Sequence, residues 1–193
     1  MEIFTVSLFG HRRISNTLIV ENALSDAVRN LVINKEYVEF LVGRDGDFDI
    51  LAASVVKRCQ REIRDDNSNL IWVLPYLTSE YRKNEVAYRS YYDEIEVFPN
   101  AGHYKSAFQS RNRFMIDRSD LVLCCIERDS GGAFQSVRYA ERMGDNQCCC
   151  FHRTNRGRIG AGSPIRPRHD TVDASILFFH EIAHPIYRTI VRR

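Results

Sequence analysis

Three short stretches of this sequence combine glycine with charged side chains directly after an apolar run. They are 9–13 (FGHRR), 43–49 (GRDGDFD) and 127–136 (ERDSGGAFQS). Glycine lets the backbone approach a phosphate closely, and arginine forms charge-assisted hydrogen bonds with phosphate oxygens. Aspartate is better suited to ribose hydroxyls or to the edge of a base. The mixture indicates a nucleotide site more strongly than a site for phosphate alone.

The third stretch carries the clearest phosphate signal. Ser130, Gly131 and Gly132 precede a helical pattern, and a helix N-terminus presents unpaired N–H groups with a partial positive charge. Neither the P-loop pattern nor G-x-G-x-x-G is present. In the second stretch, Asp47 or Asp49 could simply cap the following helix. The residues predicted to bind ligand are Gly10, His11, Arg12, Gly43, Arg44, Gly46, Asp47, Asp49, Arg111, Asp117, Ser130, Gly131 and Gly132.

The elements that position these residues alternate in kind along the chain. We expect strands over 3–9, 36–42, 70–75, 93–98, 121–126 and 147–152, and helices over 16–33, 48–64, 104–117 and 132–143. Short apolar strands alternating with helices predict an α/β, Rossmann-like three-layer fold with a mainly parallel sheet and helices on both faces. Such sheets bind ligands outside the carboxyl ends of their strands, where all three stretches should lie.

Composition divides the chain into three parts. Residues 1–152 form the predicted Rossmann-like domain. Residues 153–172 are rich in glycine, proline and arginine and indicate a basic flexible linker, whereas 173–193 regain helical periodicity and predict a C-terminal amphipathic helix. The arginines of this tail could contact nucleic-acid phosphates, although the linker has few aromatic residues for base stacking.

A second motif lies in the tail. Residues 180–184 read HEIAH and fit H-E-x-x-H, in which His180 and His184 would share one face of a helix and bind zinc. Pro185 interrupts that helix, and the residues after His184 offer no third ligand. A zinc hydrolase is therefore a remote alternative, and no metal site is predicted.

Bulk composition points to the cytoplasm. No segment approaches the roughly 20 apolar residues of a membrane helix, and the charges near the N-terminus run in the wrong order for a signal peptide. The six cysteines fall mostly in apolar runs and are interpreted as small, buried, reduced side chains. The net charge of +2 favours no particular partner. We expect no membrane partner, and a homo-oligomer is left open.

Three blocks of the chain resemble the SLOG superfamily, the group of SMF/DprA and LOG proteins. They are FGHR at 9–12, VGRDGDFDILAASVV at 42–56, and RNRFMIDRSDLVLCCIERDSGGAFQSVRYAERMG at 111–144. The nearest branch is the small YpsA-like bacterial proteins of unknown function, and the resemblance covers residues 1–150. The residues in register in the third block are Arg111, Asn112, Met115, Asp117, Asp120, Gly131, Gly132, Tyr139 and Ala140. The resemblance implies a bacterial or phage protein that binds a nucleotide or a nucleotide derivative, with NAD and ADP-ribose among the candidates.

One departure from the family bears on catalysis. LOG phosphoribohydrolases carry P-G-G-x-G-T-x-x-E, whose glutamate serves N-glycosidic hydrolysis. In this sequence Arg138 stands at the glutamate position and Phe134 at the last glycine. No catalytic motif is complete, so we expect a sensor-like nucleotide-binding protein. The alternatives are an N-glycosidic-bond-cleaving enzyme that uses Asp45, Asp47 or Asp117, and single-stranded nucleic-acid binding through the basic tail.

Overall fold

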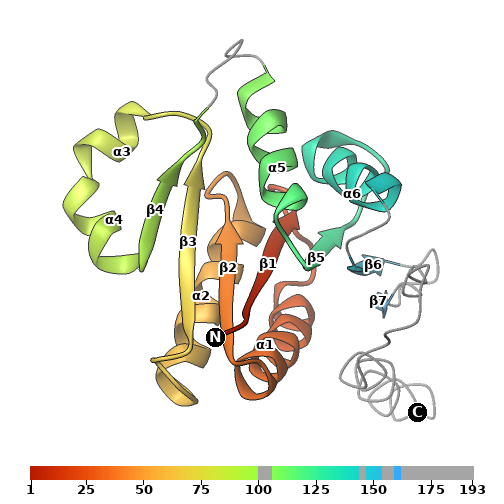
Figure 1. Cartoon of the computed structure of the whole chain (residues 1–193). Helices are drawn as coiled ribbons and strands as arrows, with labels where there is room; N and C mark the ends of the chain where they lie inside the picture. Colours follow the sequence, from red (N-terminus) through yellow and green to blue (C-terminus); the bar gives the residue numbers. More distant parts are fainter. Residues whose placement is uncertain (100–105, 144–146, 154–158, 162–193) are drawn as a thin grey trace.

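The computed structural model describes residues 1–99, 106–143, 147–153 and 159–161, the last two ranges as backbone only. Within this part of the chain the strands form one sheet in the order β4-β3-β2-β1-β5-β6-β7 (Figure 1). The strands are β1 (Ile3–Gly10), β2 (Tyr37–Val42), β3 (Ser68–Leu74), β4 (Glu94–Val97), β5 (Leu121–Ile126), β6 (Gln147–Arg153) and β7 (Ile159–Ala161). Neighbouring strands run parallel, except that β7 is antiparallel to β6.

Helices cover both faces of the sheet (Figure 1). They are α1 (Thr17–Asn34), α2 (Asp47–Glu62), α3 (Ser79–Lys83), α4 (Glu85–Tyr91), α5 (Ala107–Asp117) and α6 (Gly131–Met143). Helices α1 and α2 share one hydrophobic cluster with the sheet, and α5 and α6 share the other. The short helices α3 and α4 connect β3 to the edge strand β4. This arrangement is the predicted Rossmann-like three-layer α/β fold.

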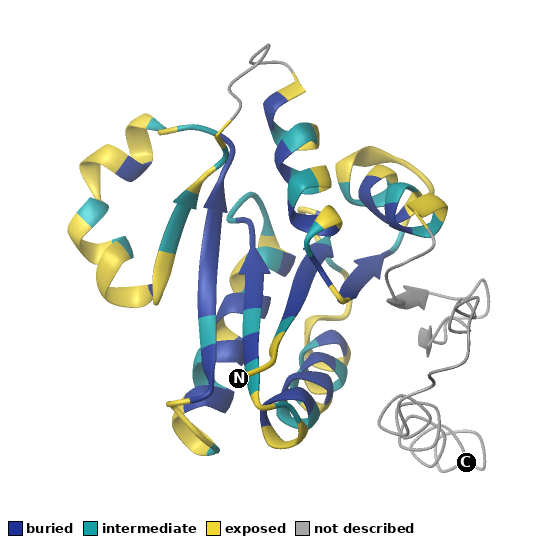
Figure 2. Ribbon diagram, viewed as in Figure 1, coloured by how far each residue is buried: buried dark blue, intermediate teal, exposed yellow. Residues whose placement is uncertain are grey.

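The central strands are mostly buried on both faces, and most of their side chains are apolar, as expected for a parallel sheet covered on both sides (Figure 2). Val6 of β1 packs beneath α1 and α2, whereas Phe9 packs beneath α5 and α6. The buried Ser7 hydroxyl lies 2.6 Å from that of Ser119, which donates to the Met115 carbonyl of α5 at 2.8 Å. These two hydroxyls are therefore paired, and they tie α5 to the central strand.

The strand order reverses between β1 and β5. The chain moves outward from β1 through β2 to β3 and β4 on one side, whereas β5 and β6 lie on the other side. In the pairing registers, Leu8 is opposite Val42 of β2, and Gly10 is opposite Cys125 of β5. The three strands therefore end at one edge of the sheet. We call the place between the β1 and β5 exits the crevice, because this is where open α/β sheets usually bind ligands.

The cysteines follow the sequence interpretation only in part. Cys59 and Cys125 are free and buried, and burial, followed by the charge of Glu127, raises the pKa of the Cys125 thiol to about 12. Cys124 is disulfide-bonded, so the interpretation of every cysteine as a reduced thiol is wrong for this residue. Among the helices that the structure describes, none is long and apolar enough to cross a membrane.

The predicted elements differ from the structure in two places. Helices α3 and α4 were not predicted, because their sequences, SEYRK and EVAYRSY, are short and largely polar. Strand β7 lies inside the predicted linker 153–172. The rest of that linker lies outside the described residues, as do the predicted helix 173–193 and its HEIAH motif.

Candidate functional site

His11 joins the two loops that border the crevice. Its Nδ1 accepts a hydrogen bond from the Glu127 backbone N–H at 3.0 Å, and its Nε2 lies 3.0 Å from the Ser130 carbonyl. Because Nδ1 is an acceptor, the hydrogen-bond network assigns the proton to Nε2, which donates to Ser130. The ring is only 5% exposed. His11 therefore braces the β1 and β5 exits in its neutral form, and both ring nitrogens are already occupied by protein partners.

The first turn of α6 is open to a ligand. Gly131 has a φ of +91°, a conformation that favours glycine, and Ser130, Gly131 and Gly132 are exposed. A Cβ added at Gly132 would meet nothing within 4 Å. The first turn holds no acidic residue, and no described group accepts a hydrogen bond from the N–H groups of residues 131–133. Free N–H groups and a helix dipole therefore point into open space at the crevice.

Gly10 and Gly46 serve close packing between the β1 exit and α2. A Cβ at Gly10 would lie 2.1 Å from Cγ of Phe48, and one at Gly46 would lie 2.3 Å from Cα of Arg12. The Asp47 N–H donates to the Arg12 carbonyl at 2.8 Å across this contact. These two glycines were predicted to approach phosphate. In the structure they instead pack against protein atoms behind the crevice.

A buried arginine fixes the β2 exit. Arg111 of α5 donates from Nη1 to the Val73 carbonyl at 2.9 Å and from Nη2 to Asp45 Oδ2 at 2.7 Å, while its Nε has no partner. A Cβ at Gly43 would lie 2.8 Å from Arg111 Nη1. Arg111 is only 4% exposed, so it is a brace between α5, β3 and the β2 exit rather than a surface contact for ligand.

Asp49 completes this loop from the first turn of α2. Its Oδ2 accepts the Asp45 N–H at 2.8 Å. Burial raises the pKa of the Asp49 carboxyl to about 6, against the opposing effects of the Asp45 N–H and of the Arg111 charge. The carboxylate therefore holds the 43–47 loop in place and titrates near neutral pH.

Two further predicted residues have their side chains engaged elsewhere. The Arg44 guanidinium lies 4.8 Å from the Tyr88 ring centroid and contacts the Tyr92 hydroxyl at 3.4 Å. Asp117 is the last residue of α5, which runs back toward the start of β5, and it accepts the Tyr139 hydroxyl at 2.7 Å. The structure therefore places Asp117 at the opposite edge of the sheet, away from the crevice.

The residues left free at the crevice are few. Arg12 and Asp47 are exposed beside the α2 start, and Ser130, Gly131 and Gly132 are exposed at the α6 start. Arg128 is also exposed in the β5 exit and was not among the predicted residues, although it lies within the 127–136 stretch. The crevice thus offers backbone N–H groups and arginines for an anion, with the exposed carboxylates of Asp47 and Asp129 beside them.

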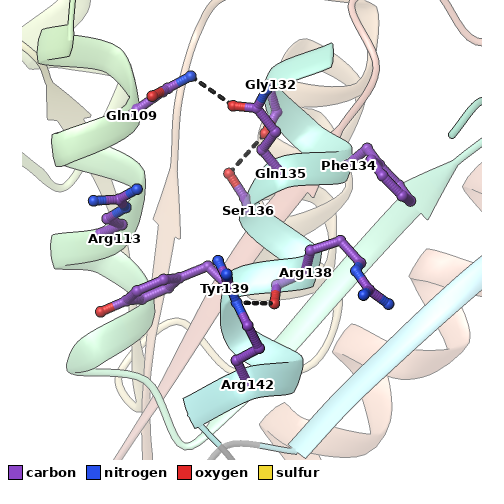
Figure 3. A pocket seen from close by; sticks show the side chains of 9 residues that line it. All are labelled: Gln109, Arg113, Gly132, Phe134, Gln135, Ser136, Arg138, Tyr139 and Arg142. Atoms are coloured by element: carbon purple, nitrogen blue, oxygen red, sulfur yellow. Dashed lines mark hydrogen bonds between the residues drawn. The ribbon is translucent and has the colours of Figure 1, made fainter. Parts of the chain in front are cut away.

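A pocket of about 270 Å³ lies next to this site, between α5 and α6 (Figure 3). Its lining residues are Gln109, Arg113, Gly132, Phe134, Gln135, Ser136, Arg138, Tyr139 and Arg142. No specific sequence pattern predicts this pocket, because its arginines lie on two separate helical surfaces that come together only in the fold. Among the described residues, no group of three or more His, Cys, Asp or Glu side chains could hold a metal ion.

No protein-family model matches the chain, and no curated protein matches it either. Among solved structures, DNA processing protein A (DprA) from Streptococcus pneumoniae has the same fold, with a TM-score of 0.56 and 13% sequence identity. The likeness covers 95% of this chain and 56% of that chain, so this chain spans little more than half of its length. At this identity the likeness shows the fold alone. It supports the Rossmann-like α/β fold and does not test the YpsA-like branch.

Proposed function

We propose that the crevice between the β1 and β5 exits binds a nucleotide or a nucleotide derivative, with one phosphate seated on the first turn of α6. The observation that carries this proposal is the set of unpaired N–H groups at residues 131–133, opened by the +91° φ of Gly131. They lie at the point where the strand order reverses, the usual ligand position in open α/β sheets.

The crevice residues divide into two roles under this proposal. Ser130, Gly131 and Gly132 contact the phosphate, Arg12 adds a charge-assisted bond, and Asp47 faces the sugar. The other predicted residues near the crevice hold these groups in position. They are Gly10, His11, Gly43, Gly46, Asp49 and Arg111.

A sensor-like role is favoured over catalysis. Arg138, which stands at the LOG glutamate position, is exposed and pairs with Glu141 at 3.2 Å. Of the carboxylates considered for N-glycosidic cleavage, Asp45 is paired with Arg111 and Asp117 lies at the other edge. Of these three carboxylates, Asp47 is the one that the described residues leave without a partner at the crevice. We also propose the YpsA-like branch as the nearest relatives, on the residues of 42–56 and 111–144.

Nucleic acid is a second candidate ligand. The solved structure of the same fold is named as a DNA processing protein, and nucleic acid offers the same phosphate chemistry to the α6 start. The proposal that the arginines of 153–172 contribute to such binding rests on the sequence alone.

Thermal unfolding with a nucleotide panel tests the proposed site. AMP, NAD, ADP-ribose and deoxynucleotides are added to the unmodified chain, to Gly132→Asp and to the matched control Gly132→Asn. The site has room for either side chain, but only Asp places a negative charge where the phosphate binds. A ligand at about 100 times its dissociation constant stabilises by about 2.7 kcal/mol, which raises Tm by roughly 5–10 °C in a chain of this size.

We expect this rise in the unmodified chain and in Gly132→Asn, and its loss in Gly132→Asp. Chromatography of the same samples separates binding from cleavage, because an N-glycosidic enzyme releases free base. If no nucleotide raises Tm, the proposed function is wrong.

A further inference from the structure

The pocket between α5 and α6 begins at the proposed phosphate site. Gly132 lines the pocket and also belongs to the exposed first turn of α6. The two helices run side by side in the same direction, since Asn112 donates to Ser136 Oγ at 2.9 Å, and Tyr139 donates to Asp117 further along. Figure 3 shows Gln109 and Arg113 on α5 with Gln135 and Tyr139 of α6 extending toward them, whereas Phe134 and Arg138 extend away from α5. A ligand seated on the α6 start can therefore continue into this groove between the two helices.

The groove carries more positive than negative charge: three arginines line it, and the nearby acids are Asp117, which accepts the Tyr139 hydroxyl, and Glu141. Arg113 lies over the Tyr139 ring, 5.3 Å from its centroid, and Arg142 donates from Nε to the Arg138 carbonyl at 3.1 Å. Among the described residues, no carboxylate forms a salt bridge with Arg113 or Arg142. Arg138 pairs with Glu141, and no lining residue is acidic. The groove is thus suited to an anion.

We propose that this groove holds a second phosphate of the same ligand, so that the ligand is a nucleoside phosphorylated at both ends of its ribose. The inference rests on the proposed function, which seats the first phosphate on α6. Tyr139 lies two helical turns from Gly132, roughly 10 Å along the axis, and the arginines reach back over part of that distance. Arg113 and Arg142 bind the second phosphate, and the Tyr139 ring and the paired Gln109 and Gln135 border the nucleoside between the two phosphates.

Three sources share this chemistry: a free nucleoside bisphosphate, a phosphorylated dinucleotide, and an internal nucleotide of a single strand. All three place a phosphate on each side of one nucleoside. AMP, with a single phosphate, can fill only the α6 site and serves as the reference ligand.

Calorimetric titration of the full chain tests the second phosphate. The ligands are AMP, adenosine bisphosphate phosphorylated at both ribose ends, a phosphorylated dinucleotide and a short oligothymidylate. The test variant is Arg113→Gln/Arg142→Gln, and the control is Arg61→Gln, an exposed arginine in the last turn of α2. A charge-assisted hydrogen bond predicts that the bisphosphate binds roughly tenfold more tightly than AMP.

We expect the double variant to lose this preference while its affinity for AMP and its Tm stay unchanged, and Arg61→Gln to keep the preference. The ligand that binds most tightly shows which of the three kinds of compound the groove recognises. An affinity that falls steeply with salt indicates a single strand of nucleic acid. If AMP binds but the bisphosphate binds no more tightly, or if the double variant keeps the preference, the inference is wrong and the proposed function stands. If neither AMP nor any other ligand binds the unmodified chain, both are wrong.

Discussion

At the scale of single residues, His11 is a buried histidine whose two ring nitrogens are both used by the protein. It accepts from Glu127 and donates to Ser130, so a ligand has no nitrogen left to contact. The sequence identified His11 as a site residue because it follows a glycine at a strand exit. That pattern does not distinguish a ligand contact from a brace, and only the placement of the β5 exit beside β1 decides between them.

Replacing His11 tests the brace. His11→Ala removes the hydrogen bonds to the partly buried Glu127 N–H and to the carbonyl of the exposed Ser130, and each lost hydrogen bond costs about 0.5–1.5 kcal/mol. We expect the free energy of unfolding to fall by this order in chemical denaturation. His11→Gln, which keeps one donor and one acceptor, should recover part of the loss. Equal stability of all three proteins would contradict the brace.

Asp49 makes stability depend on pH. Its pKa is about 6 in the folded chain and 3.8 as the ordinary value, so the folded state holds its proton more tightly than the unfolded state. The contribution of Asp49 to stability is therefore complete below about pH 4 and is lost as pH rises to about 6. Asn resembles the protonated form. The stability of Asp49→Asn relative to the unmodified chain should therefore rise by about 1–3 kcal/mol over this range and stay level above it.

Urea denaturation at several pH values between 4 and 8 provides the measurement. Asp47→Asn is the control, because Asp47 lies in the same first turn of α2 but is exposed. A difference between Asp49→Asn and the unmodified chain that does not change with pH would show that Asp49 does not titrate as described.

At the scale of the elements, the crevice depends on how closely α2 begins against the β1 exit. Gly46 packs on the Arg12 backbone, whereas Gly132 at the start of α6 faces open space. Both glycines follow strands, and both looked alike as phosphate-binding candidates. A glycine in the sequence indicates that the backbone lies close to another atom. Whether that atom belongs to the protein or to a ligand depends on which element lies opposite.

Alanine substitution separates these two kinds of glycine. Gly46→Ala forces a Cβ to 2.3 Å from the Arg12 Cα and should destabilise the chain by about 1–3 kcal/mol. Gly132→Ala meets no atom and removes a flexible residue from a helix, so stability should be unchanged or slightly higher. Thermal unfolding of the two variants measures the contrast, and equal losses would contradict the packing described for α2.

The strands, which are buried along most of their length, were predicted correctly. The two short helices with few buried residues were not. The strands are mainly apolar runs, and their bounds were predicted to within about two residues because both faces of the sheet are covered. Helices α3 and α4 depend on tertiary contacts: Tyr81 and Tyr88 pack on Trp72, with ring centroids 5.9 and 4.8 Å away. Such contacts produce no helical periodicity of apolar residues in a short polar segment.

At the scale of the whole molecule, the fold class and the edge that carries the site could both be predicted from the sequence. Asp117 shows that a family motif does not locate a residue in space unless the topology of the fold is also known. It lies in the most specific block of the resemblance, yet α5 runs opposite to the strands and carries its last residue to the far edge. The arginine groove was missed for a related reason, since it exists only where α5 and α6 lie side by side (Figure 1).

The brace from His11 to the β5 exit also bears on how the protein is made. It joins positions separated by 116 and 119 residues, because β5 pairs with the first strand of the chain. Contacts of such high sequence separation form late in folding. A nascent chain that has not yet delivered β5 has a partial sheet but no crevice. Under the proposed function, nucleotide binding is therefore acquired only after β5 has left the ribosome, and a chain truncated before that point lacks the proposed site.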